Sequence, residues 1–141
     1  MRIYRIPVVV LLVAGFLPLS LHAAEPAIHF QAHRGGLHEA PENTLAAFFH
    51  AWRLGGIPEI DIRTTSDDVI ICLHDDTLKR TSNATDQADV SISALTLGEV
   101  QRYDAGSWFD ARYAGERIPT LKQVFAALQR NADDQVYLDL K

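Results

Sequence analysis

The stretch PEIDIR at residues 58–63 indicates the fold more clearly than any other part of the chain. Successive side chains of a strand point to opposite faces, so the two isoleucines share one face and Glu59 and Asp61 share the other. The run QVYLDLK at 135–141 repeats the alternation and places Asp139 on the polar face. Neighbouring carboxylates inside a sheet cost several kcal/mol unless a cation or another partner compensates them, on the order of the known penalties for buried ions. Such acids are expected at the strand ends that form an active site at the top of a parallel barrel.

The rest of the chain alternates short apolar runs with amphipathic stretches, which favours an α/β fold. Strands are expected at residues 28–32, 57–62, 69–73 and 135–140. Because helical stretches separate the strands and ionisable residues end three of them, the sequence predicts a parallel architecture of the (β/α)8 TIM-barrel type.

Two apolar stripes at helical spacing support this reading. The first runs from Leu45 to Trp52, with Asn43 as its expected N-cap and Gly55 as its expected stop. The second begins near Leu121, after Pro119 and Thr120. Each helix therefore precedes an expected strand, as in a β/α repeat.

The composition is that of an ordinary globular protein with an acidic balance. The 141 residues include 13 Lys and Arg against 18 Asp and Glu, and 48% are hydrophobic. A negative net charge argues against a diffuse positive surface for nucleic acid or anionic lipid. The single cysteine, Cys72, lies in an apolar run and cannot form an intramolecular disulfide.

The first 24 residues are expected to be a secretory signal peptide, followed by a partial catalytic domain at residues 25–141. Arg2 and Arg5 precede an apolar run at residues 7–21, and two alanines follow it at 23–24. An uncleaved anchor is the alternative, but the run is shorter than the roughly 20 residues that span a membrane. We therefore expect a periplasmic or secreted protein without a stable membrane anchor.

Three carboxylates form a candidate metal site: Glu59, Asp61 and Asp139. An all-oxygen donor set suits Ca²⁺ or Mg²⁺ and does not suit a soft metal. The alternative is a solvated edge strand with outward acids, although a central parallel strand should be apolar on both faces.

Two histidines and two cations accompany the acids. His33 and His74 each follow a strand, so one could remove a proton and the other deliver one across a reacting centre. Arg34 and Lys141 offer fixed cations for a phosphate. The alternatives are structural histidines and surface salt bridges, which are common for such residues taken singly.

Four segments together resemble the glycerophosphodiester phosphodiesterases. They are HRGGLHEAPENT at 33–44, EIDIRTTSDDVIICLHDDTLKRT at 59–81, IPTLKQV at 118–124 and LDLK at 138–141. The resemblance implies a metal-dependent TIM-barrel hydrolase that cleaves glycerophosphodiesters to an alcohol and glycerol 3-phosphate.

The resemblance also implies a role for each candidate residue. His33 and His74 correspond to the acid/base histidines of the family, and Arg34 and Lys141 to its phosphate-contacting cations. Glu59, Asp61 and Asp139 correspond to ligands of a divalent cation, Ca²⁺ or Mg²⁺.

Two positions depart from the pattern of the family. Asp139 stands where many relatives have Glu, and it is one methylene shorter, so a metal would lie closer to that strand or be bridged by water. Asp68 stands where the family often has Gly in a turn, which strains the turn mildly if a positive φ is needed.

A (β/α)8 barrel takes about 250 residues, and only about four strands are expected here. We therefore expect the N-terminal half of the barrel, a fragment of the full enzyme. The alternative is a catalytically inactive half-barrel or interaction module that needs a second chain, and open sheet edges favour self-association. A third reading is a related barrel phosphodiesterase that acts on phosphoinositides or sphingolipids.

Overall fold

A computed structural model describes residues 29–128 and 133–141. The expected signal peptide, residues 1–24, lies outside the described residues. Among the helices of the described ranges, none has both the length and the apolar character needed to cross a membrane.

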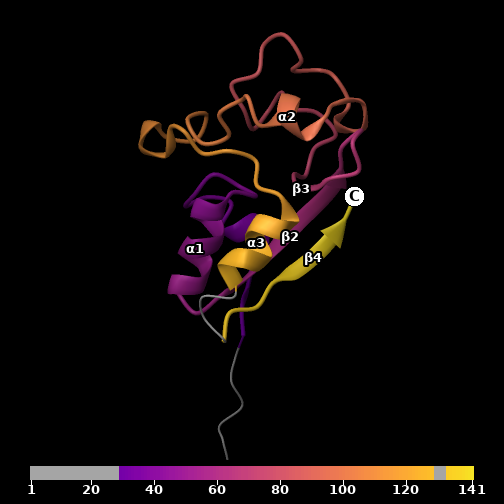
Figure 1. Cartoon of the computed structure of the whole chain (residues 1–141). Coiled ribbons are helices and arrows are strands. Elements are labelled where there is room, and N and C mark those ends of the chain that lie inside the picture. Colours follow the sequence, from indigo (N-terminus) through magenta and orange to yellow (C-terminus); the bar gives the residue numbers. More distant parts are fainter. Residues whose placement is uncertain (1–28, 129–132) are drawn as a thin grey trace, which may run out of the picture.

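The described chain is an α/β unit, as predicted (Figure 1). Its strands are β1 (Gln31–Ala32), β2 (Ile57–Thr64), β3 (Ile70–Cys72) and β4 (Tyr137–Leu140). Its α-helices are α1 (Leu45–Arg53), α2 (Leu97–Val100) and α3 (Leu121–Leu128). Short 3-10 turns lie at His33–Gly35, Ile92–Ala94 and Ala111–Tyr113. The predicted parallel sheet is present, because β1 and β4 both pair with β2 in parallel.

The third expected strand differs from the prediction, because β3 runs antiparallel to β2. Only a short turn separates the two strands, whereas a parallel pair needs a crossover of about a dozen residues or more. The turn is closed by a hydrogen bond from the Thr65 backbone N–H to the Val69 carbonyl. Asp68 in this turn has φ 61°, so the condition under which the sequence analysis expects mild strain at this position is met. Three strands, not four, are therefore parallel within the described residues.

Two hydrophobic cores stabilise two parts of the molecule. One lies between β2 and the helices α1 and α3, with members Ala40, Ala47, Phe48, Ile60, Cys72 and Val124. The other lies mainly in the long segment between β3 and α3, which we call the excursion (residues 73–119). Its members are Ile71, Leu73, Leu78, Ile92, Leu95, Val100, Ala105 and Ile118. The excursion lies beyond the carboxyl ends of β2 and β4 (Figure 1).

The start of α1 differs in one residue from the prediction. Thr44, not Asn43, is the N-cap, and its hydroxyl accepts a hydrogen bond from the Ala47 N–H. Asn43 precedes the cap in a left-handed conformation with φ 56°. Its side chain is thereby free for another role, described below.

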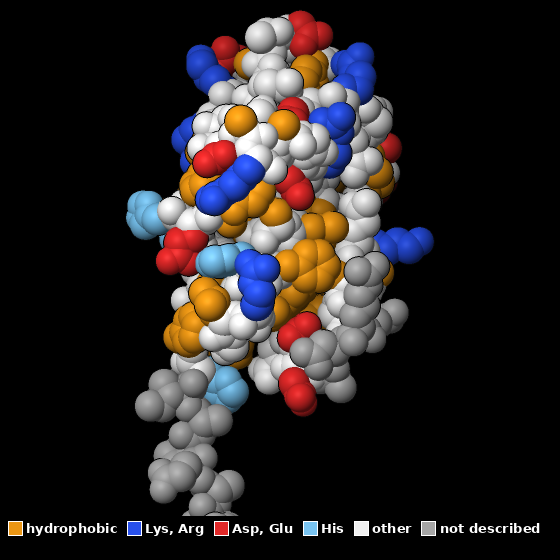
Figure 2. All heavy atoms as spheres, turned by 90° about the vertical axis from the view of Figure 1, so that its left-hand side faces the viewer, with side chains coloured by type: hydrophobic (Ala, Val, Ile, Leu, Met, Phe, Trp, Pro, Cys, Tyr) orange, Lys and Arg blue, Asp and Glu red, His pale blue; other side chains and the backbone are white. Residues whose placement is uncertain are grey.

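Several apolar side chains are exposed on the described surface. On the side shown in Figure 2, hydrophobic side chains lie among charged side chains of both signs. The most exposed large apolar residue is Leu140 of β4, at 77%, and Tyr137 and Leu138 of the same strand are also exposed. The strand that carries Asp139 is therefore the least covered part of the sheet.

Candidate active site

The three predicted carboxylates come together at one face of the sheet. Asp61 of β2 lies in register with Asp139 of β4, and Glu59 lies two residues before Asp61 on the same face. One oxygen atom of each carboxylate lies within 4.8 Å of the others. The strand alternation that points Ile60 into the core points the acids away from it. The predicted cluster is thus present among the described residues.

Asp61 is the most constrained of the three acids. Its side chain is 1% exposed, and its Oδ2 accepts a hydrogen bond of 2.8 Å from the Asn43 side-chain amide. The Asn43 carbonyl oxygen in turn accepts the Asp61 backbone N–H at 3.1 Å. The other oxygen, Oδ1, is buried, and its partner among the described residues is the Lys141 ammonium at 3.1 Å. Three clustered carboxylate oxygens, one of them buried, form a donor set that suits an oxygen-liganded cation.

Glu59 is fixed by the turn that follows β1. Its Oε2 accepts the Arg34 backbone N–H at 2.9 Å. This turn needs positive φ values at Arg34 (54°) and Gly35 (83°). A Cβ on Gly35 would lie 2.8 Å from the Ala47 side chain, so only glycine lets the turn pack against α1. The HRGG sequence therefore positions a backbone donor on a candidate metal ligand.

Two cations lie beside the acids. The Arg34 Nε lies 3.5 Å from Asp61 Oδ2, and its Nη1 donates to Glu42 at 2.9 Å. The Lys141 Nζ lies 3.1 Å from Asp61 Oδ1 and 2.5 Å from Asp139 Oδ2. The bond from Lys141 lowers the pKa of Asp139, and bonds to Asp139 and then Asp61 raise the pKa of Lys141. Both predicted phosphate contacts thus lie at the edge of the acidic cluster.

His74 lies on the segment that returns from β3. Its Nδ1 is 2.7 Å from Asp75 Oδ1, and its carbonyl accepts two bonds from the Arg63 guanidinium. From the sequence, Asp75 could either orient His74 or cap the next turn, and capping was the favoured interpretation. The structure shows the other alternative, because the Asp75 carboxylate contacts the His74 imidazole and Arg80. The pairing orients the ring of a candidate acid/base.

His33 differs from His74 in its surroundings. Its side chain is exposed and makes no hydrogen bond within the described ranges. Its carbonyl accepts the N–H groups of Gly36 and Leu37, which close the turn that contains Arg34. The imidazole is therefore placed by the backbone of the turn alone.

Sequence reasoning did not identify the supporting residues Glu42, Asn43 and Arg80. The PENT segment was interpreted only as a helix start, yet its Glu42 and Asn43 contact Arg34 and Asp61. Their signal was present, since two polar residues precede a helix that a single Thr44 suffices to cap. Arg80 offered no such signal, because it contacts Glu42, 38 residues away in the chain.

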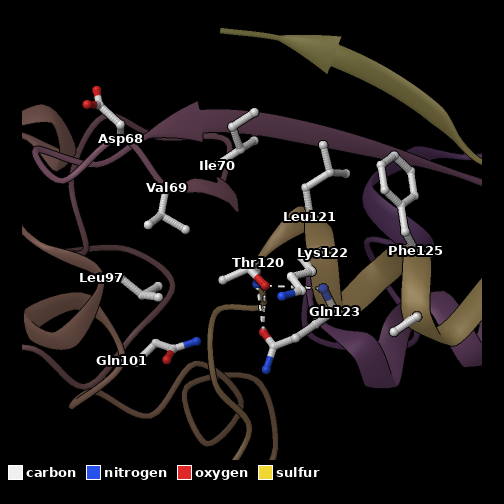
Figure 3. Close-up of a pocket in the computed structure, with 11 residues that line it drawn as sticks. Asp68, Val69, Ile70, Leu97, Gln101, Thr120, Leu121, Lys122, Gln123 and Phe125 are labelled. Atoms are coloured by element: carbon white, nitrogen blue, oxygen red, sulfur yellow. Dashed lines mark hydrogen bonds between the residues drawn. The ribbon is translucent and has the colours of Figure 1, made fainter.

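One cavity of the described structure lies away from these residues. It measures about 810 Å³ and contains none of the candidate site residues. Val69, Ile70 and Leu97 line one part of it, and Thr120 and Gln123 at the start of α3 line another (Figure 3). Its lining is mainly apolar, and the charged residues that line it are one lysine, Lys122, and one aspartate, Asp68.

Comparison with known proteins identifies the family. The sequence profile of the Glycerophosphoryl diester phosphodiesterase family matches residues 33–141. This chain belongs to that family. A glycerophosphodiester phosphodiesterase of Caldanaerobacter subterraneus subsp. tengcongensis is 45% identical over 96 residues, which are 67% of this chain. Glycerophosphodiester phosphodiesterase 1 of Mus musculus is 39% identical over 114 residues, 78% of this chain. The sequence resemblance is thereby confirmed.

Solved structures agree on the fold. The glycerophosphodiester phosphodiesterase of Agrobacterium tumefaciens matches with a TM-score of 0.73 and 35% identity, over 81% of this chain and 47% of that protein. A phosphodiesterase of Oleispira antarctica, in complex with the product sn-glycerol-3-phosphate, matches with a TM-score of 0.70 and 33% identity. That match covers 81% of this chain and 44% of that protein. These enzymes are TIM barrels, and the chain corresponds to part of that fold.

The matched region is a small share of the curated relatives. It spans 37% of the Caldanaerobacter protein and 33% of the mouse protein. The activity of the whole relatives is therefore a proposal for this chain.

Proposed function

We propose that this chain carries the metal- and phosphate-binding part of a phosphodiesterase site that cleaves glycerophosphodiesters to an alcohol and glycerol 3-phosphate. One observation carries the proposal: the oxygens of Glu59, Asp61 and Asp139 converge within 4.8 Å, beside two cationic side chains. The Oleispira relative, crystallised with sn-glycerol-3-phosphate, supports this substrate class.

The same three acids would hold a divalent cation, Ca²⁺ or Mg²⁺. The donor set is all oxygen, and one oxygen of each carboxylate lies within 4.8 Å of the others. When bound, the cation supplies positive charge for the oxygens of the phosphodiester. In the absence of a cation, three clustered carboxylates are compensated only in part by Arg34 and Lys141.

Side chains of the protein supply the rest of the chemistry, which is phosphate binding and proton exchange. The Arg34 and Lys141 cations bind phosphate oxygens and stabilise negative charge as it develops there. His33 and His74 exchange protons with the attacking oxygen and the leaving alkoxide, one as base and the other as acid. The Asp75 carboxylate accepts a hydrogen bond from the Nδ1–H of His74, which leaves Nε2 for proton exchange.

The test is release of glycerol 3-phosphate from glycerophosphocholine by the purified chain with Ca²⁺ or Mg²⁺, and calorimetric titration of either cation in parallel. Asp61→Asn should lose cation binding and turnover together. Asp89→Asn is the matched control, because Asp89 is an exposed aspartate whose side chain pairs with Lys79 in the described structure. Unchanged cation binding in Asp61→Asn would contradict the proposal. Faster cleavage of an intact phosphoinositide or sphingolipid would favour the related lipid phosphodiesterases instead.

A second candidate role is pairing with another chain. β4 pairs with β2 along one edge, and its apolar residues Tyr137, Leu138 and Leu140 are exposed in the described structure. Such an edge is a template for another strand. Light scattering tests this: a defined dimer without turnover supports an interaction module, and an active monomer excludes it.

We also propose export through a signal peptide at residues 1–24, which would place the mature protein in the periplasm or outside the cell. The support is the sequence alone, two arginines followed by an apolar run. N-terminal sequencing of the protein from fractionated cells tests it. A first residue near position 25 is expected, and an intact N-terminus in the cytoplasmic fraction would contradict export.

A further inference from the structure

Five charged or ionisable side chains form a continuous series beside the acidic cluster. Its order is Arg34, Glu42, Arg80, Asp75 and His74. It connects the candidate phosphate-binding arginine to the candidate acid/base histidine. Two of its members, Glu42 and Arg80, have no role in the chemistry proposed above.

Arg80 lies at the centre of this series and contacts both carboxylates with two bonds each. Its Nη1 and Nη2 donate to the two oxygens of Glu42 at 2.7 and 2.8 Å. Its Nε and Nη2 donate to the two oxygens of Asp75, both at 2.8 Å. Only a planar guanidinium offers enough donors in fixed directions to hold two carboxylates in this way.

These contacts differ from an ordinary surface ion pair. The Glu42 side chain is 2% exposed and that of Asp75 is 27% exposed, although Arg80 itself is 44% exposed. Burial alone would raise the pKa of Glu42, but hydrogen bonds from Arg80 and Arg34 lower it. The hydrogen bond from Arg80 likewise lowers the pKa of Asp75 well below its usual range. Arg80 therefore keeps one buried and one partly buried carboxylate charged.

The consequence reaches His74 through Asp75. A carboxylate that accepts from Nδ1 fixes the proton on that nitrogen and leaves Nε2 unprotonated in the neutral ring. Arg80 uses both oxygens of Asp75, so the carboxylate cannot rotate without breaking bonds to Arg80. The orientation of the imidazole thus depends on a residue that contacts neither the histidine nor the acidic cluster.

We propose that Arg80 is a positioning residue: through Asp75 it fixes the tautomer and orientation of His74, and through Glu42 it orients Arg34. The functional meaning of this positioning rests on the proposed phosphodiesterase activity. The positioning itself is a property of the chain and can be measured without substrate.

The experiment compares Arg80→Met with Lys79→Met in the full 141-residue chain. Lys79 is the adjacent cation of the same loop, and it contacts only the exposed Asp89. Long-range ¹H–¹⁵N spectra at about pH 8.5, above the ordinary histidine pKa, report which imidazole nitrogen carries the proton. The signals of His74 are assigned by their loss in His74→Gln.

In the parent chain and in Lys79→Met, we expect the Nδ1–H tautomer of His74 to dominate. In Arg80→Met the Asp75 carboxylate is no longer held by Arg80 and can rotate away from Nδ1. The ratio of Nδ1–H to Nε2–H should then fall about tenfold, because the hydrogen bond from Nδ1 to a charged group contributes about that factor or more. If Arg80→Met does not fold, Arg80→Lys decides, since it keeps the charge but cannot bond to both carboxylates at once. A parent-like ratio in either folded variant would overturn the assignment.

The result is independent of turnover. A chain that shows the tautomer change but releases no glycerol 3-phosphate supports the role of Arg80 and contradicts the proposed activity. A chain that turns over while its tautomer is unaffected by Arg80→Met overturns the role of Arg80 and leaves the activity standing.

Discussion

The two aspartates that face each other across the sheet, Asp61 on β2 and Asp139 on β4, have very different surroundings. Asp61 is 1% exposed and exchanges two hydrogen bonds with Asn43. The Asp139 side chain is 49% exposed, and its one hydrogen bond within the described residues comes from Lys141. The fold therefore holds Asp61, the first candidate ligand, in place, whereas Asp139, the second, is held mainly by the backbone of its own strand.

The difference shows that one candidate site can combine acids that the fold encloses with an acid that is largely exposed. The segment 33–44 encloses Asp61 and Glu59, so we expect those acids to contribute to folding as well as to the proposed cation binding. The apolar residues of β4 are exposed, so little packing surrounds Asp139 and its side chain should contribute little to stability. Substitutions on the two strands should therefore separate stability from cation binding.

The largest effect is expected for Asp61→Ala. This change leaves the Asn43 amide without its buried partner and removes one of the two buried carboxylates that contact the Arg34 guanidinium. Removing one member of a buried charged pair costs about 3–5 kcal/mol, so the free energy of unfolding should fall by about 3 kcal/mol or more. Ca²⁺ and Mg²⁺ binding should also be lost. Urea unfolding and calorimetric titration measure the two effects.

Asp139→Ala is the matched control on the exposed strand. Cation affinity should fall because a ligand is removed, whereas the urea midpoint should match that of the parent, because the side chain is half exposed. Equal losses of stability in the two variants would show that the difference in burial has no energetic consequence.

The second effect concerns Asn43, which connects the 33–44 segment to β2. Asn43→Ala should lower the free energy of unfolding by about 2–3 kcal/mol, because it removes two buried hydrogen bonds and places alanine at φ 56°. Asn43→Gly relieves the backbone strain but still lacks the side-chain amide that bonds to Asp61. If the glycine variant were as stable as the parent, the contacts to Asp61 would contribute nothing.

How much of this site could be predicted from the sequence follows from the range of each interaction. Strand alternation placed Glu59, Asp61 and Asp139 on one face, and parallel pairing brought them together. These rules act locally or through regular pairing, so they can be read from residue spacing. The spacing of the apolar residues at 45–52 also predicted α1 within one residue of its N-cap.

The rest depended on contacts that spacing does not encode. The direction of β3 follows from a short turn, whose length was visible but was not weighed against the crossover that a parallel pair needs. The contact between Glu42 and Arg80 joins residues 38 positions apart, and it exists only because the excursion folds back over the 33–44 segment. From the sequence alone, Glu42 is interpreted as part of a helix start and Arg80 as a surface cation.

Acid unfolding offers a third way to compare the buried and exposed acids. The pKa of Glu42 is lowered in the folded state by Arg80 and Arg34, which outweigh its burial. A lowered carboxyl pKa stabilises the fold above the ordinary carboxyl pKa of about 4 and loses that contribution as the pH falls below it. The urea midpoint should therefore fall between about pH 5 and pH 3.

Glu42→Gln should reduce the slope of that fall, because the charge that must be protonated is gone. Asp139→Asn should leave the slope nearly unchanged, although the pKa of Asp139 is also lowered, because that side chain is exposed and its bond to Lys141 is screened by solvent. A larger change in slope for Asp139→Asn than for Glu42→Gln would reverse the comparison.

The smallest effect is expected at Asp68, in the turn between β2 and β3. The residue has φ 61°, a conformation that favours glycine, and its side chain is exposed. Relief of the left-handed strain of about 1 kcal/mol or more is offset in part by the greater entropy of an unfolded chain with glycine. Asp68→Gly should therefore raise the free energy of unfolding by about 0.5 kcal/mol. Cation binding should not change, because no candidate ligand lies in the turn. A change in cation affinity in this variant would show that the turn does influence the acids of β2.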